Sequence, residues 1–313
     1  MAKKKMVVTV LGCGHVGSSI AWLLMDDNRF NLDINIMCDT EVNEGRLMEL
    51  KHCQAFHHKH RLYINNAEMF HESDVVFHAA AVKRKIIGSR MEVLKENMEV
   101  TDKVFRGVRF KKDVRIIVLS NPVDIISWYT WKVTGLEHWQ VIGSGTLIDS
   151  VRMAAIVAER MGLQSSDVFA RVVGEHGETM TPLISQLRVK GNTIDHKYLN
   201  DEDFIHSVRQ ETIFAARKIK LTQEATYMGI AECAVRMMDA LFQKEETFNW
   251  PASVLLPDAC NIKLKVQTPI YISVPLILGN KKYKVDNSVE LTEREWSQLR
   301  VSAIYLENII KGL

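Results

Sequence analysis

A glycine-rich run near the start of the chain holds the first residues whose types and spacing could do chemistry. The run is Gly12-Cys13-Gly14-His15-Val16-Gly17, directly after the β-branched segment 6–11. Glycines at this spacing allow a tight turn, and the helix that follows presents unsatisfied N–H groups to an anion such as a pyrophosphate. We therefore expect Gly12, Gly14, His15, Val16 and Gly17 to bind a dinucleotide. The alternative is a purely structural turn between a strand and a helix.

An acidic side chain follows the second predicted strand. Asp39 stands 22 residues after Gly17, where a carboxylate would bind ribose hydroxyls and repel a 2′-phosphate. Thr40 and Glu41 come next, so no arginine directly follows that would favour NADP. NAD is therefore the expected cofactor.

Two further motifs lie in the second half of the chain: Ile148-Asp149-Ser150-Val151-Arg152 and Gly174-Glu175-His176-Gly177. Together with the glycine-rich run, they make the chain resemble the L-lactate/malate dehydrogenase family of 2-hydroxy acid dehydrogenases over essentially its whole length. The resemblance also includes, in family order, Asp74-Val75-Val76, Arg84, Arg90, Asn97, Ser120-Asn121-Pro122-Val123-Asp124 and Val141-Ile142-Gly143-Ser144-Gly145.

The resemblance implies a role for each polar residue in oxidising a 2-hydroxy acid. Histidine titrates near neutrality, so His176 would take the hydroxyl proton while a hydride leaves for the nicotinamide. Asp149 would bond the other ring nitrogen, and Arg152 would clamp the substrate carboxylate with two parallel bonds. Arg90 would polarise the carbonyl oxygen from a mobile loop that excludes water. Asn121 would hydrogen-bond the substrate oxygen.

The resemblance also implies further cofactor contacts and one backbone feature. Asn97 and Asn121 join the glycine-rich run and Asp39 as cofactor-binding residues. The Asn121-Pro122 peptide bond is expected to be cis, which is almost exclusively a property of bonds that precede proline.

The substrate is predicted from the residue six positions before Arg90. Malate-type members resemble this chain in having arginine there, as Arg84, whereas lactate-type members carry glutamine. A guanidinium matches a second carboxylate with two hydrogen bonds, so malate and oxaloacetate are favoured. Thr226 and the Glu175-His176 spelling resemble lactate-type members instead. L-Lactate and branched-chain L-2-hydroxy acids are the alternatives, the latter if Ile86 and Ile87 in the altered loop Ile86-Ile87-Gly88 face the pocket.

The elements that must position these residues follow an alternating pattern in the first half of the chain. Short β-branched runs alternate with amphipathic segments, which is typical of parallel βαβ units. We therefore expect an α/β protein with a doubly wound parallel Rossmann sheet over residues 1–145. The expected strands are 6–11, 34–38, 62–64, 75–78, 114–119 and 141–143, and the expected helices are 15–28, 42–57, 90–110 and 122–133.

The second half predicts an α+β catalytic domain over residues 146–313. Its expected helices are 147–161, 201–219, 225–243 and a last helix after Thr292, where Thr-x-x-Glu has the spacing of a capping box. Its expected strands are 167–173, 183–190, 252–256, 270–275 and 283–287.

Composition excludes several classes of partner. Lys and Arg number 40 against 38 Asp and Glu, a net charge of +2, so no bulk field favours nucleic acid or an anionic membrane. No apolar run is long enough to cross a bilayer. The five scattered cysteines indicate reduced thiols in a cytoplasmic protein. The expected partner is a small 2-hydroxy or 2-keto acid, and family habit suggests a homodimer or homotetramer.

Two alternative interpretations remain open from the sequence. The run His57-His58-Lys59-His60 could bind a metal, but no acidic or cysteine residue stands at ligand spacing, so an exposed helix end is expected and no metal. The chain could also be an NAD-binding protein without catalysis. Retention of the full set His176, Asp149, Arg152 and Arg90 favours an enzyme.

Overall fold

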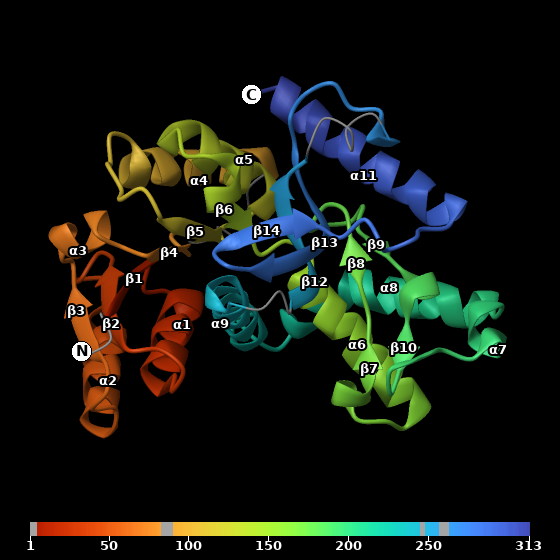
Figure 1. Cartoon of the computed structure of the whole chain (residues 1–313), viewed down its shortest axis with the longest axis horizontal. Coiled ribbons are helices and arrows are strands. Elements are labelled where there is room, and N and C mark those ends of the chain that lie inside the picture. Colours follow the sequence, from red (N-terminus) through yellow and green to blue (C-terminus); the bar gives the residue numbers. More distant parts are fainter. Residues whose placement is uncertain (1–4, 83–89, 245–247, 257–262) are drawn as a thin grey trace. The chain divides into compact units, whose positions relative to one another are not determined.

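The computed structural model describes residues 5–82, 90–244, 248–256 and 263–313. These residues form two compact units (Figure 1). Unit 1 comprises Met1–Gly143 and Tyr227–Phe242, and unit 2 comprises Ser144–Thr226 and Gln243–Leu313. The predicted linear division after residue 145 differs from this grouping in the segment 227–242, which returns to unit 1.

Within the described residues of unit 1, six parallel strands lie in the order β3-β2-β1-β4-β5-β6. The chain builds outward from β1 to β3, then places β4, β5 and β6 on the other side of β1. The doubly wound sheet is therefore confirmed, and its reversal between β1 and β4 is where such sheets bind ligands. The strands are β1 (Met6–Leu11), β2 (Leu32–Met37), β3 (Arg61–Ile64), β4 (Val75–His78), β5 (Arg115–Val118) and β6 (Val141–Gly143).

The strands of unit 1 are buried because the helices that connect them cover the sheet. Val8 and Val10 of β1 are fully buried, as are Ile20 and Leu24 on the apolar face of the first helix. Near-continuous apolar strands of this kind are typical of parallel sheets covered on both faces. The helices are α1 (His15–Asp26), α2 (Glu44–Cys53), α3 (Ala67–His71), α4 (Arg90–Phe105), α5 (Val123–Thr134) and α9 (Met228–Phe242).

Helix α9 belongs to unit 1 because it packs against α1 and the residues after it. Arg29 lies 2.6 Å from the buried carboxylate of Asp27 and also pairs with the buried Asp239 of α9. The rings of Phe30 and Phe242 meet edge to face at 6.5 Å. One guanidinium thus lies against two buried carboxylates, a tertiary contact that no local sequence pattern signals.

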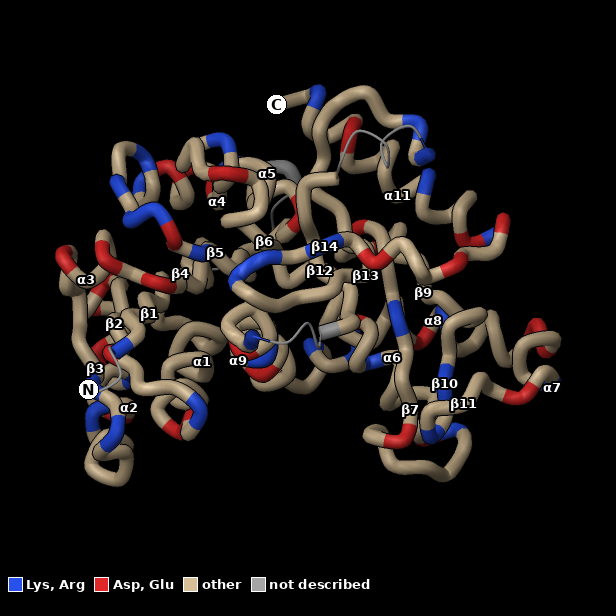
Figure 2. The backbone as a smooth tube through the Cα atoms, in the orientation of Figure 1, with Lys and Arg blue, Asp and Glu red and all other residues tan. Residues whose placement is uncertain are grey.

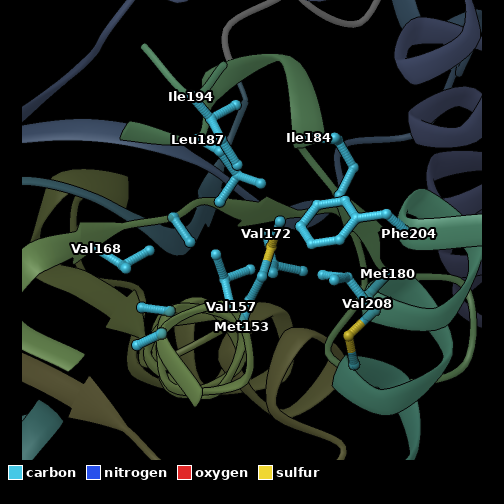
Figure 3. Packing of buried hydrophobic residues seen from close by; sticks show 13 residues of the cluster. Met153, Val157, Val168, Val172, Met180, Ile184, Leu187, Ile194, Phe204 and Val208 are labelled. Carbon is cyan, nitrogen blue, oxygen red and sulfur yellow. The ribbon is translucent and has the colours of Figure 1, made fainter. Parts of the chain in front are cut away.

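Unit 2 is built around helix α6 (Leu147–Met161). Met153 and Val157 of α6 face Val172, Phe204 and Val208 in one apolar cluster (Figure 3). The other elements are β7 (Val168–Phe169), β8 (Val172–Val173), β9 (Thr181–Pro182), β10 (Arg188–Val189), β11 (Asn192–Thr193), α7 (His196–Leu199), α8 (Glu202–Ile219), β12 (Phe248–Leu255), β13 (Tyr271–Gly279), β14 (Lys282–Val285) and α11 (Glu293–Lys311). Strands β12, β13 and β14 pair antiparallel.

The last helix begins as its sequence predicts. The Thr292 side chain accepts from the backbone N–H of Glu295, and the Glu295 carboxylate accepts from the backbone N–H of Thr292. The capping box is therefore confirmed. Glu295 also accepts from the N–H and hydroxyl of Ser185, so the same carboxylate holds a neighbouring loop.

Several predicted elements differ from the structure, mainly where elements are short. The helix expected over 42–57 ends at Cys53 and continues as a 3-10 turn, Gln54–Phe56. The strand expected over 183–190 contains a 3-10 turn, Ile184–Gln186, before β10. Helices α3 and α7 were not predicted, because five and four residues are too few for a helical period to appear. Each is instead started by a capping side chain, Asn66 and Asp195.

The histidine run after α2 is only partly exposed. His60 is 3% exposed, accepts at Nδ1 from the backbone N–H of Leu32 and contacts the Asp27 carbonyl through Nε2 at 2.6 Å. The prediction of an exposed helix end was wrong for His60, whose two ring nitrogens contact the backbone at the two ends of the connection between α1 and β2. Among the described residues, no group of three or more His, Cys, Asp or Glu side chains is arranged to hold a metal.

Basic and acidic residues are interspersed along the backbone of both units. Figure 2 shows Lys and Arg interspersed with Asp and Glu in both units, consistent with the net charge of +2. No helix in the described ranges combines the length and the apolar content needed to cross a membrane.

Candidate active site

The glycine-rich turn between β1 and α1 is shaped by close backbone packing. Gly12 adopts φ +90°, and a Cβ there would lie 2.9 Å from the Ala79 carbonyl oxygen and the Ala80 nitrogen. A Cβ on Gly17 would overlap the Gly12 carbonyl oxygen. Gly14 is different, because a Cβ there would meet nothing within 4 Å. Two glycines are thus required by the protein's own packing, while Gly14 borders open space.

The first turn of α1 is suited to an anion. Gly14 is the N-cap and supplies no side-chain acceptor, so the N–H groups at the helix start are left for a ligand. His15 and Val16 are the first two residues of α1 and are half-buried. The His15 ring stacks on the ring of Tyr227, also in unit 1, with centroids 5.1 Å apart.

An arginine that sequence reasoning missed lies beside this turn. Arg46 of α2 places Nη2 3.3 Å from Nε2 of His15. It stands 31 residues from His15 along the chain, and no motif spacing signals the approach. Only the parallel packing of the βαβ units brings α2 next to the start of α1.

Asp39 lies at the carboxyl end of β2, on the exposed surface. Its Oδ1 accepts from the backbone N–H groups of Glu41 at 3.1 Å and Val42 at 3.4 Å. These bonds hold the carboxylate in a turn immediately after the strand. The position is the one predicted for a ribose-binding acid.

Asn97, in the middle of α4, and Asn121, in the turn after β5, are brought together. Asn97 donates from Nδ2 to the Asn121 carbonyl at 2.6 Å, and its Oδ1 accepts from the backbone N–H of Val82 at 2.9 Å. The Asn121-Pro122 bond is cis, as the resemblance implied. Asn97 is 3% exposed, whereas Asn121 is exposed, so only Asn121 offers its side chain freely to a ligand.

His176, Asp149 and Arg152 meet within unit 2. Nδ1 of His176 lies 2.6 Å from one oxygen of Asp149, and Arg152 donates to the other oxygen at 2.9 Å. Asp149 and Arg152 are one turn apart on α6, so they share a face. Both oxygens of the carboxylate are therefore occupied by cationic or hydrogen-bonding partners.

The electrostatics of this triad follow from its burial. Asp149 is 1% exposed. Burial alone would raise the pKa of the Asp149 carboxyl, but the His176 ring and the Arg152 guanidinium outweigh burial and hold it below its ordinary 3.8. Asp149 is thus an anion that orients the ring and would stabilise a proton on it.

The loop that carries His176 is anchored on both sides. Gly174 has φ +95° and exchanges two backbone hydrogen bonds with Ser273 of β13. The Glu175 carboxylate turns back and accepts from the N–H and hydroxyl of Thr179 at 3.1 and 2.6 Å. The Glu175 N–H donates to the Ser302 hydroxyl of α11. Thr179 and Ser302 were missed from the sequence because neither lies in a recognisable motif.

Arg84 and Arg90 are the two remaining predicted site residues. Arg84 lies outside the described residues, together with Ile86, Ile87 and Gly88. Arg90 is the first residue of α4, which agrees with the predicted helix start.

Comparison with known proteins assigns the family. Residues 6–143 match the lactate/malate dehydrogenase NAD binding domain, and residues 146–313 match the lactate/malate dehydrogenase alpha/beta C-terminal domain. The chain therefore belongs to the lactate/malate dehydrogenase family of NAD-dependent oxidoreductases. Its cofactor is NAD, in agreement with the glycine-rich turn and Asp39.

Named relatives and solved structures cover nearly the whole chain. L-Lactate dehydrogenase 1 of Enterococcus faecalis is 29% identical over 325 residues, which is 99% of this chain and 94% of the relative. L-Lactate dehydrogenase 1 of Staphylococcus aureus is 29% identical over 97% of this chain and 95% of its own length. A Cryptosporidium parvum lactate dehydrogenase, solved with lactic acid and nicotinamide adenine dinucleotide, has a TM-score of 0.88 at 25% identity over 98% of both chains. The malate dehydrogenase of the same organism also scores 0.88 at 25% identity, over 99% of both chains.

The unequal space around the glycines predicts unequal effects of substitution. Gly17→Ala should destabilise the fold by about 1–3 kcal/mol, because its Cβ overlaps backbone that cannot swing away. Gly14→Ala should leave the unfolding temperature unchanged and weaken NADH binding about tenfold or more, since its Cβ enters the space beside the helix start. Calorimetry and NADH fluorescence titration measure the two effects.

Gly45→Ala, also in open space but on α2, is the control and should change neither binding nor fold. Equal unfolding temperatures for Gly17→Ala and Gly14→Ala would contradict this packing argument.

Proposed function

We propose that this protein interconverts an L-2-hydroxy acid and its 2-oxo acid, with His176 as the general acid and base. The observation that carries the proposal is the buried Asp149 carboxylate bonded at once to the His176 ring and to Arg152. A histidine oriented in this way takes a hydroxyl proton in one direction and returns it in the other. NAD supplies the hydride acceptor.

Each residue of the proposed site then has a distinct task. Asp149 keeps Nδ1 of His176 protonated, which leaves Nε2 to face the substrate, and it stabilises the imidazolium that forms. Arg152, oriented by its bond to Asp149, binds the substrate carboxylate. Arg90 polarises the carbonyl oxygen as negative charge develops there, and Asn121 hydrogen-bonds the same oxygen.

The cofactor side of the proposal rests on unit 1. We assign the pyrophosphate to the turn formed by Gly12, Gly14 and Gly17, with His15 and Val16 at the helix start, and the ribose hydroxyls to Asp39. Asn97 and Asn121 border the nicotinamide end. Arg46, beside His15, adds a positive charge next to the proposed pyrophosphate position.

Replacing the proposed base tests the reaction. His176→Asn should fold and bind NADH as the wild type does, yet lose about a thousandfold in kcat, because proton transfer and charge stabilisation are lost together. Stopped-flow or steady-state absorbance of NADH measures the rate. The matched control is His206→Asn, an exposed histidine of α8 in the same unit, which should retain full activity. A near wild-type rate in His176→Asn would remove this residue from its role. A wild-type protein that reduces no 2-oxo acid would leave a non-catalytic NAD-binding protein as the better description.

For the substrate, we propose malate and oxaloacetate, on the identity of Arg84. An unpaired guanidinium in a site that excludes water is costly, so pyruvate, with a methyl group at its far end, should be rejected. Oxaloacetate supplies a second carboxylate that pairs with the charge.

Arg84→Gln tests this assignment. It should lower kcat/KM for oxaloacetate about a hundredfold and raise that for pyruvate, since it removes the charge but keeps a hydrogen-bonding end. Arg109→Gln, an exposed arginine after α4, is the control. An oxaloacetate to pyruvate ratio that does not change in Arg84→Gln would contradict malate as the substrate.

L-Lactate is the second candidate, favoured by different observations. The relatives at 29% identity are named L-lactate dehydrogenases, and Thr226 and the Glu175-His176 spelling resemble the lactate type. A panel of oxaloacetate, pyruvate and 2-ketoisocaproate with NADH separates malate, lactate and branched-chain activity. The acid reduced with the highest kcat/KM identifies the substrate class.

We also propose a cytoplasmic homodimer or homotetramer. Trp22, Met48 and Phe56 are 51%, 50% and 84% exposed on neighbouring elements of unit 1, and such apolar groups favour association. Cys13, Cys38 and Cys53 are free thiols, as expected in a reducing compartment. Light scattering should return two or four times 35.8 kDa, and Phe56→Glu should lower that mass. A wild-type mass of 35.8 kDa at micromolar concentration would contradict self-association.

A further inference from the structure

A buried chain of hydrogen bonds lies behind Asn121 in unit 1. It runs from His78, the last residue of β4, through Thr101 to Asn97 on α4, and we name these three residues the Asn97 clamp. Their exposed fractions are 0%, 0% and 3%. None of the three was predicted to act together with another, because they come from two elements and only Asn97 belongs to a motif.

The direction of each bond in the clamp is determined by its donors. The Thr101 hydroxyl donates to the backbone carbonyl of Asn97, one helical turn earlier in α4, at 2.8 Å, so its oxygen is left to accept. Nε2 of His78 lies 3.1 Å from that oxygen and must therefore be the protonated nitrogen. Burial lowers the pKa of His78 to about 3, so the ring stays neutral at physiological pH.

Burying a histidine ring at this point of the core costs free energy of desolvation, which its hydrogen bond to Thr101 must offset. Its ring packs edge to face against Phe105 with centroids 5.1 Å apart, as an apolar aromatic ring would. Its Nδ1 has no hydrogen-bond partner among the described residues. Phenylalanine would fill the same position without this unpaired atom, so the specific contribution of His78 is the hydrogen bond to Thr101.

The far end of the clamp joins two segments that border the proposed site. Asn97 accepts from the Val82 N–H and donates to the Asn121 carbonyl, at 2.9 and 2.6 Å. The segment that ends at Val82 begins at Ala79, whose carbonyl oxygen packs on Gly12 of the cofactor turn. One amide side chain thus ties the segment beside the cofactor turn to the turn that presents Asn121.

We propose that His78 and Thr101 are positioning residues that act through Asn97 to set the distance between the cofactor turn and Asn121. This inference rests on the proposed function, because the distance matters for turnover only if hydride passes between cofactor and a substrate bound at Asn121. Misplacing reacting groups by a fraction of an ångström to one ångström lowers turnover by one to two powers of ten.

The test compares the single variant Thr101→Val with a double variant in which His78→Phe is added. Thr101→Val keeps the shape of the side chain and removes the hydroxyl, which leaves Nε2 of His78 buried and unpaired. The double variant Thr101→Val with His78→Phe removes that unpaired group. Thr101→Ser keeps the hydroxyl and is the matched control.

A positioning role and a purely structural role differ in the double variant. Thr101→Val should lower the unfolding temperature, and the double variant should restore it. If the clamp positions the site, kcat for the best 2-oxo acid falls about tenfold in both variants, with KM for NADH within twofold of wild type. Thr101→Ser retains wild-type kcat. Recovery of kcat together with the unfolding temperature in the double variant would overturn the proposal.

A second readout keeps this inference separate from the proposed function. Hydrogen exchange by mass spectrometry on peptides that contain Val82 reports the bond to Asn97 without any substrate. Faster exchange in the double variant, with wild-type exchange in Thr101→Ser, is the expected result. Unchanged exchange overturns the clamp even if the enzyme is active. A wild-type protein that reduces no 2-oxo acid overturns the proposed function and, with it, the role of the clamp in turnover.

Discussion

A single buried carboxylate, that of Asp149, is the constraint around which the candidate site of unit 2 is organised. An ion removed from water loses several kcal/mol of solvation, which only close partners can offset. Arg152 and His176 supply those partners on the two oxygens. Arg152 lies on the same helix as Asp149, so its position beside the carboxylate depends only on local helical geometry. His176 comes from a separate loop, so the carboxylate also determines where that loop must lie.

The loop itself is held by a second carboxylate with a different task. Glu175 is 8% exposed and turns inward to accept from Thr179, while its own N–H donates to Ser302. A residue next to the candidate base thus stabilises the backbone of the loop that carries it. Glu307 follows the same rule elsewhere in unit 2, accepting from the N–H groups of Gln267 and Thr268. Buried acids in this unit stabilise loops that have no regular secondary structure.

In unit 1 the comparable constraint is steric. Gly17 packs against Gly12 and Val10 of β1, and Gly12 packs against the segment that follows β4, so α1 can start close to the sheet only if both glycines lack a side chain. This contact places the N–H groups of the helix start beside the end of β1, and Arg46 and His15 then add side chains near the same point. Packing therefore fixes two of the three glycines of this turn, while a Cβ on Gly14 would meet nothing within 4 Å.

The sequence by itself determined the class of the fold and its doubly wound parallel sheet, and it singled out the candidate residues. These properties are encoded locally: period-two and period-3.6 patterns, a glycine spacing, and a Thr-x-x-Glu cap whose bonds form between residues three apart. Asp149 and Arg152 could be placed on one helical face for the same reason. Short elements such as α3 escaped prediction because a few residues show no period.

Only the tertiary structure decided which distant groups meet. Arg29 reaches both Asp27 and Asp239 of α9, and the ring of His60 contacts the backbone at the two ends of the connection between α1 and β2. The bonds from His78 through Thr101 to Asn97 likewise join a strand end to a helix. Such contacts satisfy buried polar groups across long sequence separations, and their partners are set by how the layers pack, which no local pattern records.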